Sequence, residues 1–267
     1  MTLTLTAARP RPTTVDDLPT VALDEVLAQA ALQTRIDRKY LLGSSTLEQV
    51  LGAVRGLRVL AIEGRRTFGY RSVYFDTPER DAFHGAGRGR RRRFKVRTRV
   101  YRASGDAWLE VKTRGPRGTT VKTRLPYDLA AAGLLTPEGR DFVAGVLAEH
   151  HVDGVDAGDL VPSLHTAYDR TTLLLPGTPD AAPTRATIDS GLVWRLPDDS
   201  TGELRGEGLI IVETKGGSSP SALDRALWRH GVRPATISKY GAGLAALDPD
   251  LPALKWHRAL VQHLRVA

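Results

Sequence analysis

Apolar and polar residues alternate over several short stretches of the chain, a pattern typical of strands that bury one face. The stretch FKVRTRVY, residues 94–101, is the clearest example, because Lys95, Arg97 and Arg99 fall between apolar or β-branched residues. These basic side chains are therefore expected on one face of a sheet. Strands are predicted over residues 34–42, 57–64, 66–77, 93–101, 106–114, 119–127, 163–175, 183–196 and 206–216.

Turn and helix signals complete this outline. Ser104-Gly105-Asp106 and the GPRG sequence at 115–118 both fit hairpin turns, so the strands around them are expected to form an antiparallel meander. A helix is predicted to begin at Pro137, with Thr136 as its cap. Other helices are predicted over residues 21–33, 45–56, 220–230, 240–247 and 253–264. The sequence therefore predicts an α+β fold around one large antiparallel sheet.

No clear linker divides the chain. Residues 1–20 lack the basic and apolar regions of a signal peptide and are predicted to be a disordered N-terminal tail, followed by a single domain over residues 21–267. No stretch approaches the roughly 20 apolar residues that cross a bilayer. The chain has no cysteine, which excludes disulfides and thiolate metal sites and fits a cytoplasmic protein.

The charge of the chain favours an anionic partner. Its 38 lysines and arginines exceed its 30 acidic residues, for a net charge of +8. Nucleic acid, a membrane surface and phosphates all fit this balance.

The position of the charges within the predicted strands is more informative. Each strand places its ionisable residues on one face. The groups are Arg35, Asp37 and Lys39; Lys95, Arg97 and Arg99; Glu110, Lys112 and Arg114; Lys122 and Arg124; Arg185 and Asp189, with Thr187 between them; and Glu213 with Lys215. A sheet with one solvated face would explain any single strand. The excess of bases is harder to explain in this way, because like charges opposite one another destabilise a sheet.

A bound anion would reverse that effect. If the sheet closes into a barrel with these residues inside, its lumen would select a linear polyanion. Glu110, Asp189 and Glu213 could then hold a divalent metal together with oxygens of the substrate. Trp108 and Trp194 are assigned to the opposite face, packing between the sheet and the helices.

Eight motifs in order, over about residues 32–245, resemble a known family. They are RIDRKYLL, SVYFDT, KVRTRVY, WLEVKTR, YDR, RATID, IVETK and SKY. They resemble the VTC-type polyphosphate polymerase domain, a member of the triphosphate tunnel metalloenzyme (CYTH-like) superfamily. The resemblance implies an eight-stranded antiparallel β-barrel, a tunnel with helices packed outside. It also implies a metal-dependent phosphotransferase that moves the γ-phosphoryl group of ATP to a growing polyphosphate chain.

The resemblance also assigns residues. The catalytic, phosphate-binding positions would be Lys39, Arg97, Arg99, Lys112, Lys122, Arg170, Arg185, Lys215 and Lys239. Of these, Arg97, Arg99, Lys215 and Lys239 are also assigned to cofactor binding. Glu213 would hold Mn²⁺ or Mg²⁺, with Glu110 as a second carboxylate. Asp37 stands where the family often has glutamate, which would move or weaken a metal contact.

Other functions stay open. Water as the acceptor would give a tripolyphosphatase, and a ribose hydroxyl would give a nucleotidyl cyclase. A non-catalytic module that binds polyphosphate or RNA is a third reading, although few aromatics on the charged faces argue against RNA recognition by stacking. The resemblance implies ATP and inorganic polyphosphate as partners, together with a membrane protein that receives the polymer. Nucleic acid is not expected as a partner.

Overall fold

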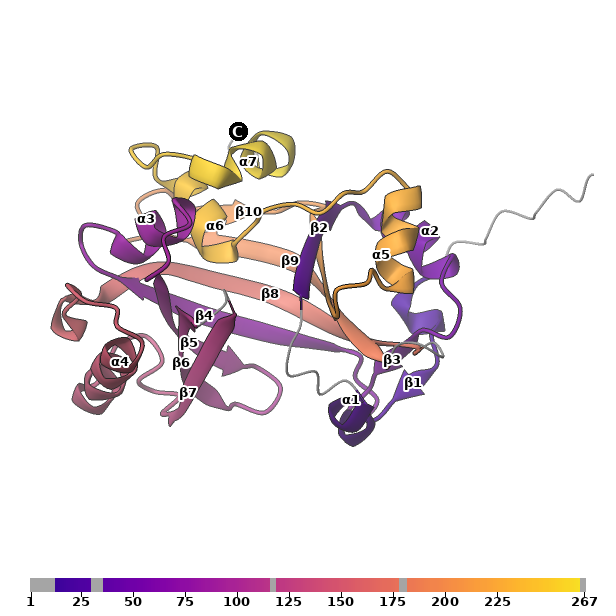
Figure 1. Cartoon of the computed structure of the whole chain (residues 1–267), viewed down its shortest axis with the longest axis horizontal. Coiled ribbons are helices and arrows are strands. Elements are labelled where there is room, and N and C mark those ends of the chain that lie inside the picture. The colour runs from indigo at the N-terminus through magenta and orange to yellow at the C-terminus, as the bar shows by residue number, and fades with distance from the viewer. Residues whose placement is uncertain (1–12, 30–35, 116–118, 178–181, 265–267) are drawn as a thin grey trace, which may run out of the picture. The chain divides into compact units, whose positions relative to one another are not determined.

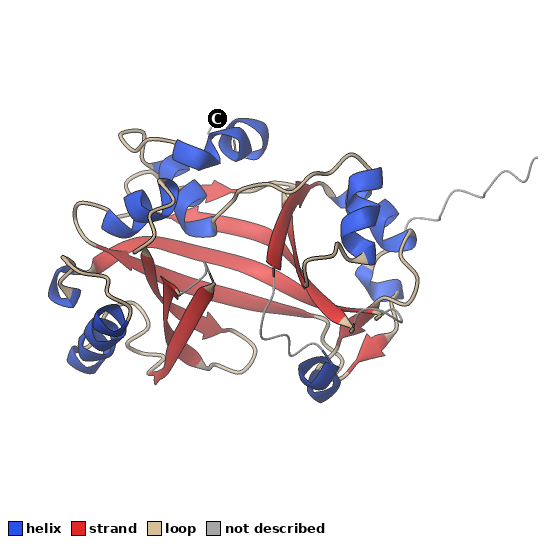
Figure 2. Cartoon of the chain, in the orientation of Figure 1, coloured by secondary structure: helices blue, strands red, loops and turns tan. Residues whose placement is uncertain are grey.

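The computed structural model describes residues 13–29, 36–115, 119–177 and 182–264. Figure 1 labels its elements, and Figure 2 separates the strands from the helices. The strands are β1 (Thr20–Val21), β2 (Ile36–Leu42), β3 (Arg58–Leu60), β4 (Thr67–Asp76), β5 (Phe94–Tyr101), β6 (Ala107–Arg114), β7 (Thr120–Tyr127), β8 (Val161–Leu175), β9 (Thr184–Arg195), β10 (Glu203–Arg205) and β11 (Ile210–Gly216). The predicted antiparallel, strand-rich α+β fold is confirmed.

Helices lie between the strands and after the last of them. The α-helices are α1 (Leu23–Gln29), α2 (Ser44–Gly52), α3 (Asp81–Gly87), α4 (Pro137–Glu149), α5 (Ala222–Arg229), α6 (Lys239–Leu247) and α7 (His257–His263). Short 3₁₀ turns are η1 (Val15–Asp17), η3 (Ala157–Asp159) and η4 (Leu254–Trp256). None of the helices in the described ranges is long and apolar enough to cross a membrane.

The sheet differs from the predicted barrel. It has 11 strands, and its main path runs β2-β11-β9-β8-β4-β5-β6-β7 without closing, with β1, β3 and β10 attached beside it. At one end of the path, β7 exposes every second side chain, including Lys122 and Arg124. It also contains Pro126, which has no N–H to donate to a further strand. These are features of an edge strand, and the expectation of a closed eight-stranded barrel is wrong.

The described residues fall into two compact units. Unit 1 comprises the described residues within Met1–Thr67, Thr171–Ile188 and Ile210–Pro234. Unit 2 comprises the described residues within Phe68–Arg170, Asp189–Leu209 and Ala235–Ala267. Strands β8 and β9 contribute residues to both. The single domain predicted over residues 21–267 stays a prediction.

In unit 1, β2 pairs antiparallel with β11, and α2 and α5 contact each other (Figure 1). In α2, Leu47, Val50 and Leu51 recur at helical spacing and are buried in one apolar cluster with Tyr40 and Val212. Residues 13–20, which the sequence places in a disordered tail, form η1 and part of β1, and β1 pairs in parallel with β3. Residues 1–12 of that predicted tail lie outside the described residues. So do residues 30–33 of the first predicted helix, Arg35 of the first predicted strand, and residues 116–118 of the predicted hairpin turn.

In unit 2, β5, β6 and β7 form the predicted antiparallel meander. Helix α4 packs against β6 and β7 (Figure 1). It begins as predicted, because the Thr136 side chain accepts a hydrogen bond from the Gly139 backbone and Pro137 follows the cap. The apolar face of the meander is buried at Val96, Leu109 and Val111.

Candidate functional site

The strand register aligns side chains of unit 2 in rows across β4 to β7. The rows are Lys95–Lys112–Lys122, then Tyr74–Arg97–Glu110–Arg124, then Ser72–Arg99–Trp108–Pro126. Residues directly opposite one another in a sheet lie on the same face. The predicted shared face of the charged residues on β5, β6 and β7 is thus confirmed, and it is called the basic face below.

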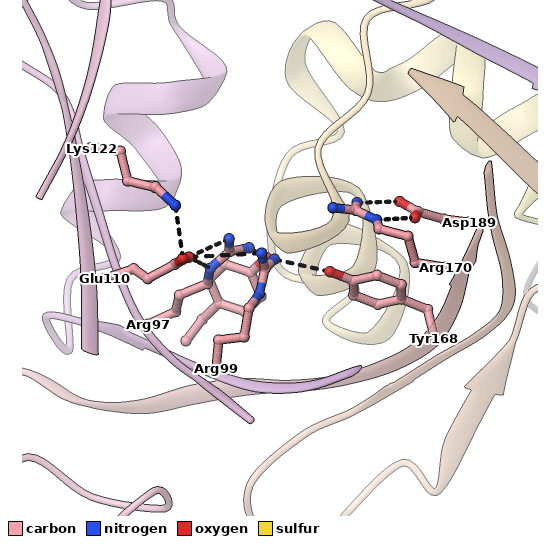
Figure 3. Close-up of polar contacts among 8 residues, drawn as sticks. Arg97, Arg99, Glu110, Lys122, Tyr168, Arg170 and Asp189 are labelled. Atoms are coloured by element: carbon pink, nitrogen blue, oxygen red, sulfur yellow. Dashed lines mark hydrogen bonds and ion pairs between the residues drawn. The ribbon is translucent and has the colours of Figure 1, made fainter. Parts of the chain in front are cut away.

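Glu110 is the centre of the first charged cluster on this face. Its side chain is fully buried, and its Oε2 accepts hydrogen bonds from Nε and Nη2 of Arg97 at 2.8 and 2.5 Å. Lys122 donates to Oε1 at 3.2 Å, and Nη1 of Arg99 lies 3.9 Å from Oε2. Figure 3 shows these basic side chains directed at one carboxylate.

The surroundings of Glu110 keep it ionised. Burial would raise its pKa, but the charges of Arg97, Arg99 and Lys122 outweigh burial and hold the pKa well below its ordinary value. Burial would likewise lower the pKa of Arg97, yet the nearby Tyr74 and Glu110 raise it. Glu110 is therefore an internal counter-ion for the bases around it.

Asp189 of β9 is the centre of a second cluster in unit 2. It is fully buried and accepts two hydrogen bonds from Arg170 of β8, from Nε to Oδ1 at 2.6 Å and from Nη2 to Oδ2 at 2.8 Å. Lys239, the first residue of α6, also donates to Oδ2. Burial raises the pKa of Asp189, but Lys239 and Arg170 outweigh it and lower the pKa to about 2.

Tyr168 lies between the two clusters (Figure 3). Its hydroxyl accepts a hydrogen bond from Nη2 of Arg99 at 2.9 Å, and the Nζ of Lys239 lies 4.4 Å from its ring centroid. Burial raises the pKa of this phenol, but the charges of Arg99, Arg170 and Lys239 lower it below its ordinary value. Sequence reasoning missed this residue, although Tyr168 stands two residues before Arg170 and so shares its face of β8.

Lys95 is a second residue absent from the predicted site. Its Nζ donates to the hydroxyl of Ser238 at 2.7 Å. The same hydroxyl accepts from the Gly241 backbone at 3.2 Å and caps α6. The N-terminus of α6 is thereby tied to the lysine row of the basic face.

The remaining predicted residues lie in unit 1. The register of β2 and β11 places Glu213 opposite Lys39 and Lys215 opposite Asp37, so that unlike charges face each other. Lys215 bonds to Glu213 and lies 3.8 Å from Asp37. Arg185 stands partly buried on β9, which is next to β11 in the sheet.

The two carboxylates assigned to a metal differ in their surroundings. Glu110 is buried among three cationic side chains, which does not suit a divalent cation. Glu213 and Asp37 fit better, since Lys215 bridges two carboxylates on neighbouring strands, and magnesium sites use one or two carboxylates together with phosphates. Within the described ranges, no three histidine, aspartate or glutamate side chains group as metal ligands.

The two tryptophans assigned to packing also differ. Trp194 is fully buried and donates to the Lys239 carbonyl at 2.8 Å, as expected of a packing residue. Trp108 instead stands opposite Arg99 on the basic face, and the guanidinium of Arg124 lies 4.3 Å from its ring centroid. The assignment of Trp108 to the apolar face is wrong, because residues 108 and 110 have the same parity in β6 and so point to the same side.

Several solved structures are similar to this chain. HpAC1 from Hippeastrum, a protein with a dominant triphosphatase activity, is 16% identical, with a TM-score of 0.47 over 83% of this chain and 99% of that one. A protein from Vibrio parahaemolyticus is 11% identical, with a TM-score of 0.40 over 77% and 95%. The PH1819 protein from Pyrococcus horikoshii is 14% identical, with a TM-score of 0.38 over 74% and 88%.

The sequence comparisons are more decisive about the family. A search of curated proteins gives no match. The comparison with protein families matches residues 34–248 to the VTC domain, which is most of the 267 residues. The match includes the strands of both charged clusters and of the Glu213–Lys39 pair. The chain therefore belongs to the VTC domain family.

Proposed function

We propose that this protein is an ATP-dependent polyphosphate polymerase that binds phosphates on its basic face. The observation that carries the proposal is the burial of Arg97 and Arg99, 9% and 8% exposed, on a face whose bases outnumber the carboxylates Glu110 and Asp189. Buried cations in excess of their counter-ions are costly unless an anion joins them. Phosphate groups supply such an anion in a form that guanidinium groups bind well.

An unsatisfied donor supports the same proposal. The Nε of Arg99 is buried and has no hydrogen-bond partner among the described residues. Buried donors are nearly always paired in folded proteins, so an unpaired one marks a place where a ligand oxygen is expected. This donor belongs to the row next to that of Glu110 and Arg97.

The proposed reaction requires alignment and neutralisation of charge. A terminal oxygen of polyphosphate attacks the γ-phosphorus of ATP, the bond from that phosphorus to the bridging oxygen breaks, and ADP leaves. The basic residues hold donor and acceptor in line and offset the charge on the transferred oxygens. A protein nucleophile is not required for this step.

In unit 1, Glu213 and Asp37 are the proposed ligands of Mn²⁺ or Mg²⁺, and Lys39, Arg185 and Lys215 are the proposed phosphate-binding bases. A divalent metal would neutralise charge on phosphate oxygens when bound. Lys215 bonds to Glu213 and lies near Asp37, so its charge is offset by the same two carboxylates that would hold the ion. Nothing in the described residues supports the membrane-protein partner.

The tripolyphosphatase and the nucleotidyl cyclase use the same phosphate-binding residues with another acceptor. The residues of the basic face do not distinguish these two activities from the polymerase, because one fold supports several reactions. The motif resemblance favours the polymerase. A binding module without turnover is the remaining alternative.

The test is to incubate the protein with ATP and Mn²⁺ and to separate the products on a gel stained for polyphosphate. We expect a ladder of polyphosphate chains together with ADP, and its loss in Glu213→Gln, because the amide removes the charge that holds the metal. Glu203→Gln is the matched control, since Glu203 is exposed on β10 and pairs with Arg205. It should retain the ladder.

Each other outcome points to a different function. Phosphate release without a ladder would replace the polymerase by a tripolyphosphatase, and a cyclic nucleotide would replace it by a cyclase. Binding of polyphosphate without any turnover would leave a binding module. Equal activity in Glu213→Gln and Glu203→Gln would refute the metal assignment.

A further inference from the structure

An aromatic side chain interrupts the basic face. Trp108 stands opposite Arg99 of β5 on one side and Pro126 of β7 on the other. The neighbouring row is charged, with Arg97, Glu110 and Arg124. The indole is partly exposed, so it is open to a ligand on the face that carries the phosphate-binding residues.

Arg124 behaves differently from the other bases near Glu110. It stands directly opposite Glu110 in the register, yet among the described residues it forms no ion pair. Its exposed guanidinium lies over the indole of Trp108 instead, 4.3 Å from the ring centroid. The two side chains form a stacked pair, called the Trp108–Arg124 platform below.

More aromatic rings follow at this end of the face. Tyr101 comes two residues after Arg99 in β5 and contacts Tyr70 edge-on, with ring centroids 5.0 Å apart. Tyr70 also stacks on Tyr168 at 5.4 Å. From the lysine row toward Trp108 and Tyr101, the face therefore changes from cationic to aromatic.

A ligand that complements both parts has phosphates at one end and a planar ring at the other. A nucleoside triphosphate has this form, whereas inorganic polyphosphate has no ring. Nucleobases stack on aromatic side chains and on guanidinium planes, and every base presents a suitable surface.

We propose that the Trp108–Arg124 platform is the subsite for the base of a nucleoside triphosphate whose phosphates lie on the basic face. The inference rests on the proposed use of ATP and adds the residues that separate a nucleotide from an inorganic polyphosphate. Stacking is insensitive to the identity of the base, so GTP is expected to bind about as well as ATP.

The test measures binding of ATP and of inorganic tripolyphosphate separately by isothermal titration calorimetry. Trp108→Ala should weaken ATP binding roughly ten-fold, since one stacked base contributes about this much, and should leave tripolyphosphate binding unchanged. Trp108→Phe keeps a ring and should retain most of the ATP affinity. Arg124→Ala should weaken the binding of ATP more than the binding of tripolyphosphate.

The control for a lost surface charge is Arg229→Ala, because Arg229 is an exposed arginine of α5 in unit 1. This variant should leave the ratio of the two affinities unchanged.

The other outcomes overturn the inference in distinguishable ways. Equal weakening of both ligands in Trp108→Ala, restored by Trp108→Phe, would make Trp108 a packing residue. Unchanged affinities in both variants would remove the platform from the site. If the wild-type protein binds tripolyphosphate but not ATP, the base subsite is refuted and the phosphate site remains. If it binds neither ligand, the proposed function is refuted as well.

Discussion

At the scale of single residues, the carboxylates of Glu110 and Asp189 hold the arginine and lysine side chains around them in place. Each is fully buried and receives hydrogen bonds from two basic side chains. An ionised carboxylate in such a place stabilises the fold only while it stays charged. It also holds the guanidinium of Arg97 or Arg170 in one orientation before any ligand binds. Preorganisation of this kind would lower the cost of binding the phosphate groups of the proposed substrate.

The pH dependence of stability should report the charge of Asp189. Its pKa of about 2 lies below that of an aspartate in the unfolded chain, near 3.9, so the unfolded state binds more protons between these values. The stabilisation is complete above about pH 4 and is lost as the pH falls toward 2. It amounts to something on the order of 2 kcal/mol. Urea unfolding of wild type and Asp189→Asn at pH 7 and pH 2.5 measures it.

We expect Asp189→Asn to be less stable at pH 7 and the difference from wild type to shrink at pH 2.5. Asp153→Asn is the control, because Asp153 forms an exposed ion pair with Arg92 and should change little at either pH. An equal deficit of Asp189→Asn at both pH values would mean that packing of the side chain, and not its charge, stabilises the fold.

At the scale of elements, the meander of β5, β6 and β7 positions the basic face, and α4 covers the opposite side. The strand register sets the positions of the charged side chains, because it aligns Arg97 with Glu110 and Lys95 with Lys112. The first turn of α4 sits closely on β7, and the Tyr127 hydroxyl accepts a hydrogen bond from the Thr136 backbone at 2.8 Å. The cap of the helix and the edge strand are thus joined.

Substitution by alanine should change the melting temperature in opposite directions at two glycines of α4. In Gly139→Ala the new methyl group would stand 2.7 Å from the Tyr127 hydroxyl, whereas Gly145 has no atom within 4 Å of that position. Alanine favours a helix over glycine by about 1 kcal/mol. Gly145→Ala should therefore raise the melting temperature, and Gly139→Ala should lower it despite the same gain in helix propensity. Calorimetric melting of both variants tests this, and a rise in both would show that α4 moves away from β7 at little cost.

At the scale of the whole molecule, the net charge of +8 acts beyond the contacts of any one residue. Exposed Arg90 and Arg91 precede β5 and face solvent, while Arg97 in the same strand is buried. Surface charges attract a long polyanion and are screened by salt, whereas buried ones are screened much less. The two sets should thus contribute to binding in different ways.

Replacing Arg90 and Arg91 by glutamine should weaken binding of long polyphosphate several-fold at 50 mM salt and less at 200 mM, with turnover retained. Arg97→Ala should abolish turnover at both salt concentrations while the protein stays folded by circular dichroism. Fluorescence anisotropy with labelled polyphosphate and the gel assay measure the two effects. Equal and mild losses from both variants would contradict the division between a surface set and a buried set.

Much of the site could be predicted from the sequence because face assignment is local. The alternation in β5 and β6 placed Arg97, Arg99 and Glu110 on one side, and the register confirms it. Tyr168 and Lys95 were missed as site residues, since a tyrosine or a lysine in a strand has many common uses. Closure of the barrel was wrong because it depends on whether the two end strands pair, which no local pattern encodes.

The sequence by itself determined the strands, the hairpins, the start of α4 and the side of each strand that carries charge. These follow from periods of two and from turn and cap chemistry, which act between residues close in the chain. Only the tertiary structure decided which base meets which acid. Asp189 pairs with Arg170 and with Lys239, 19 and 50 residues away in the chain. Such contacts are set by strand order and register, because these bring distant segments side by side.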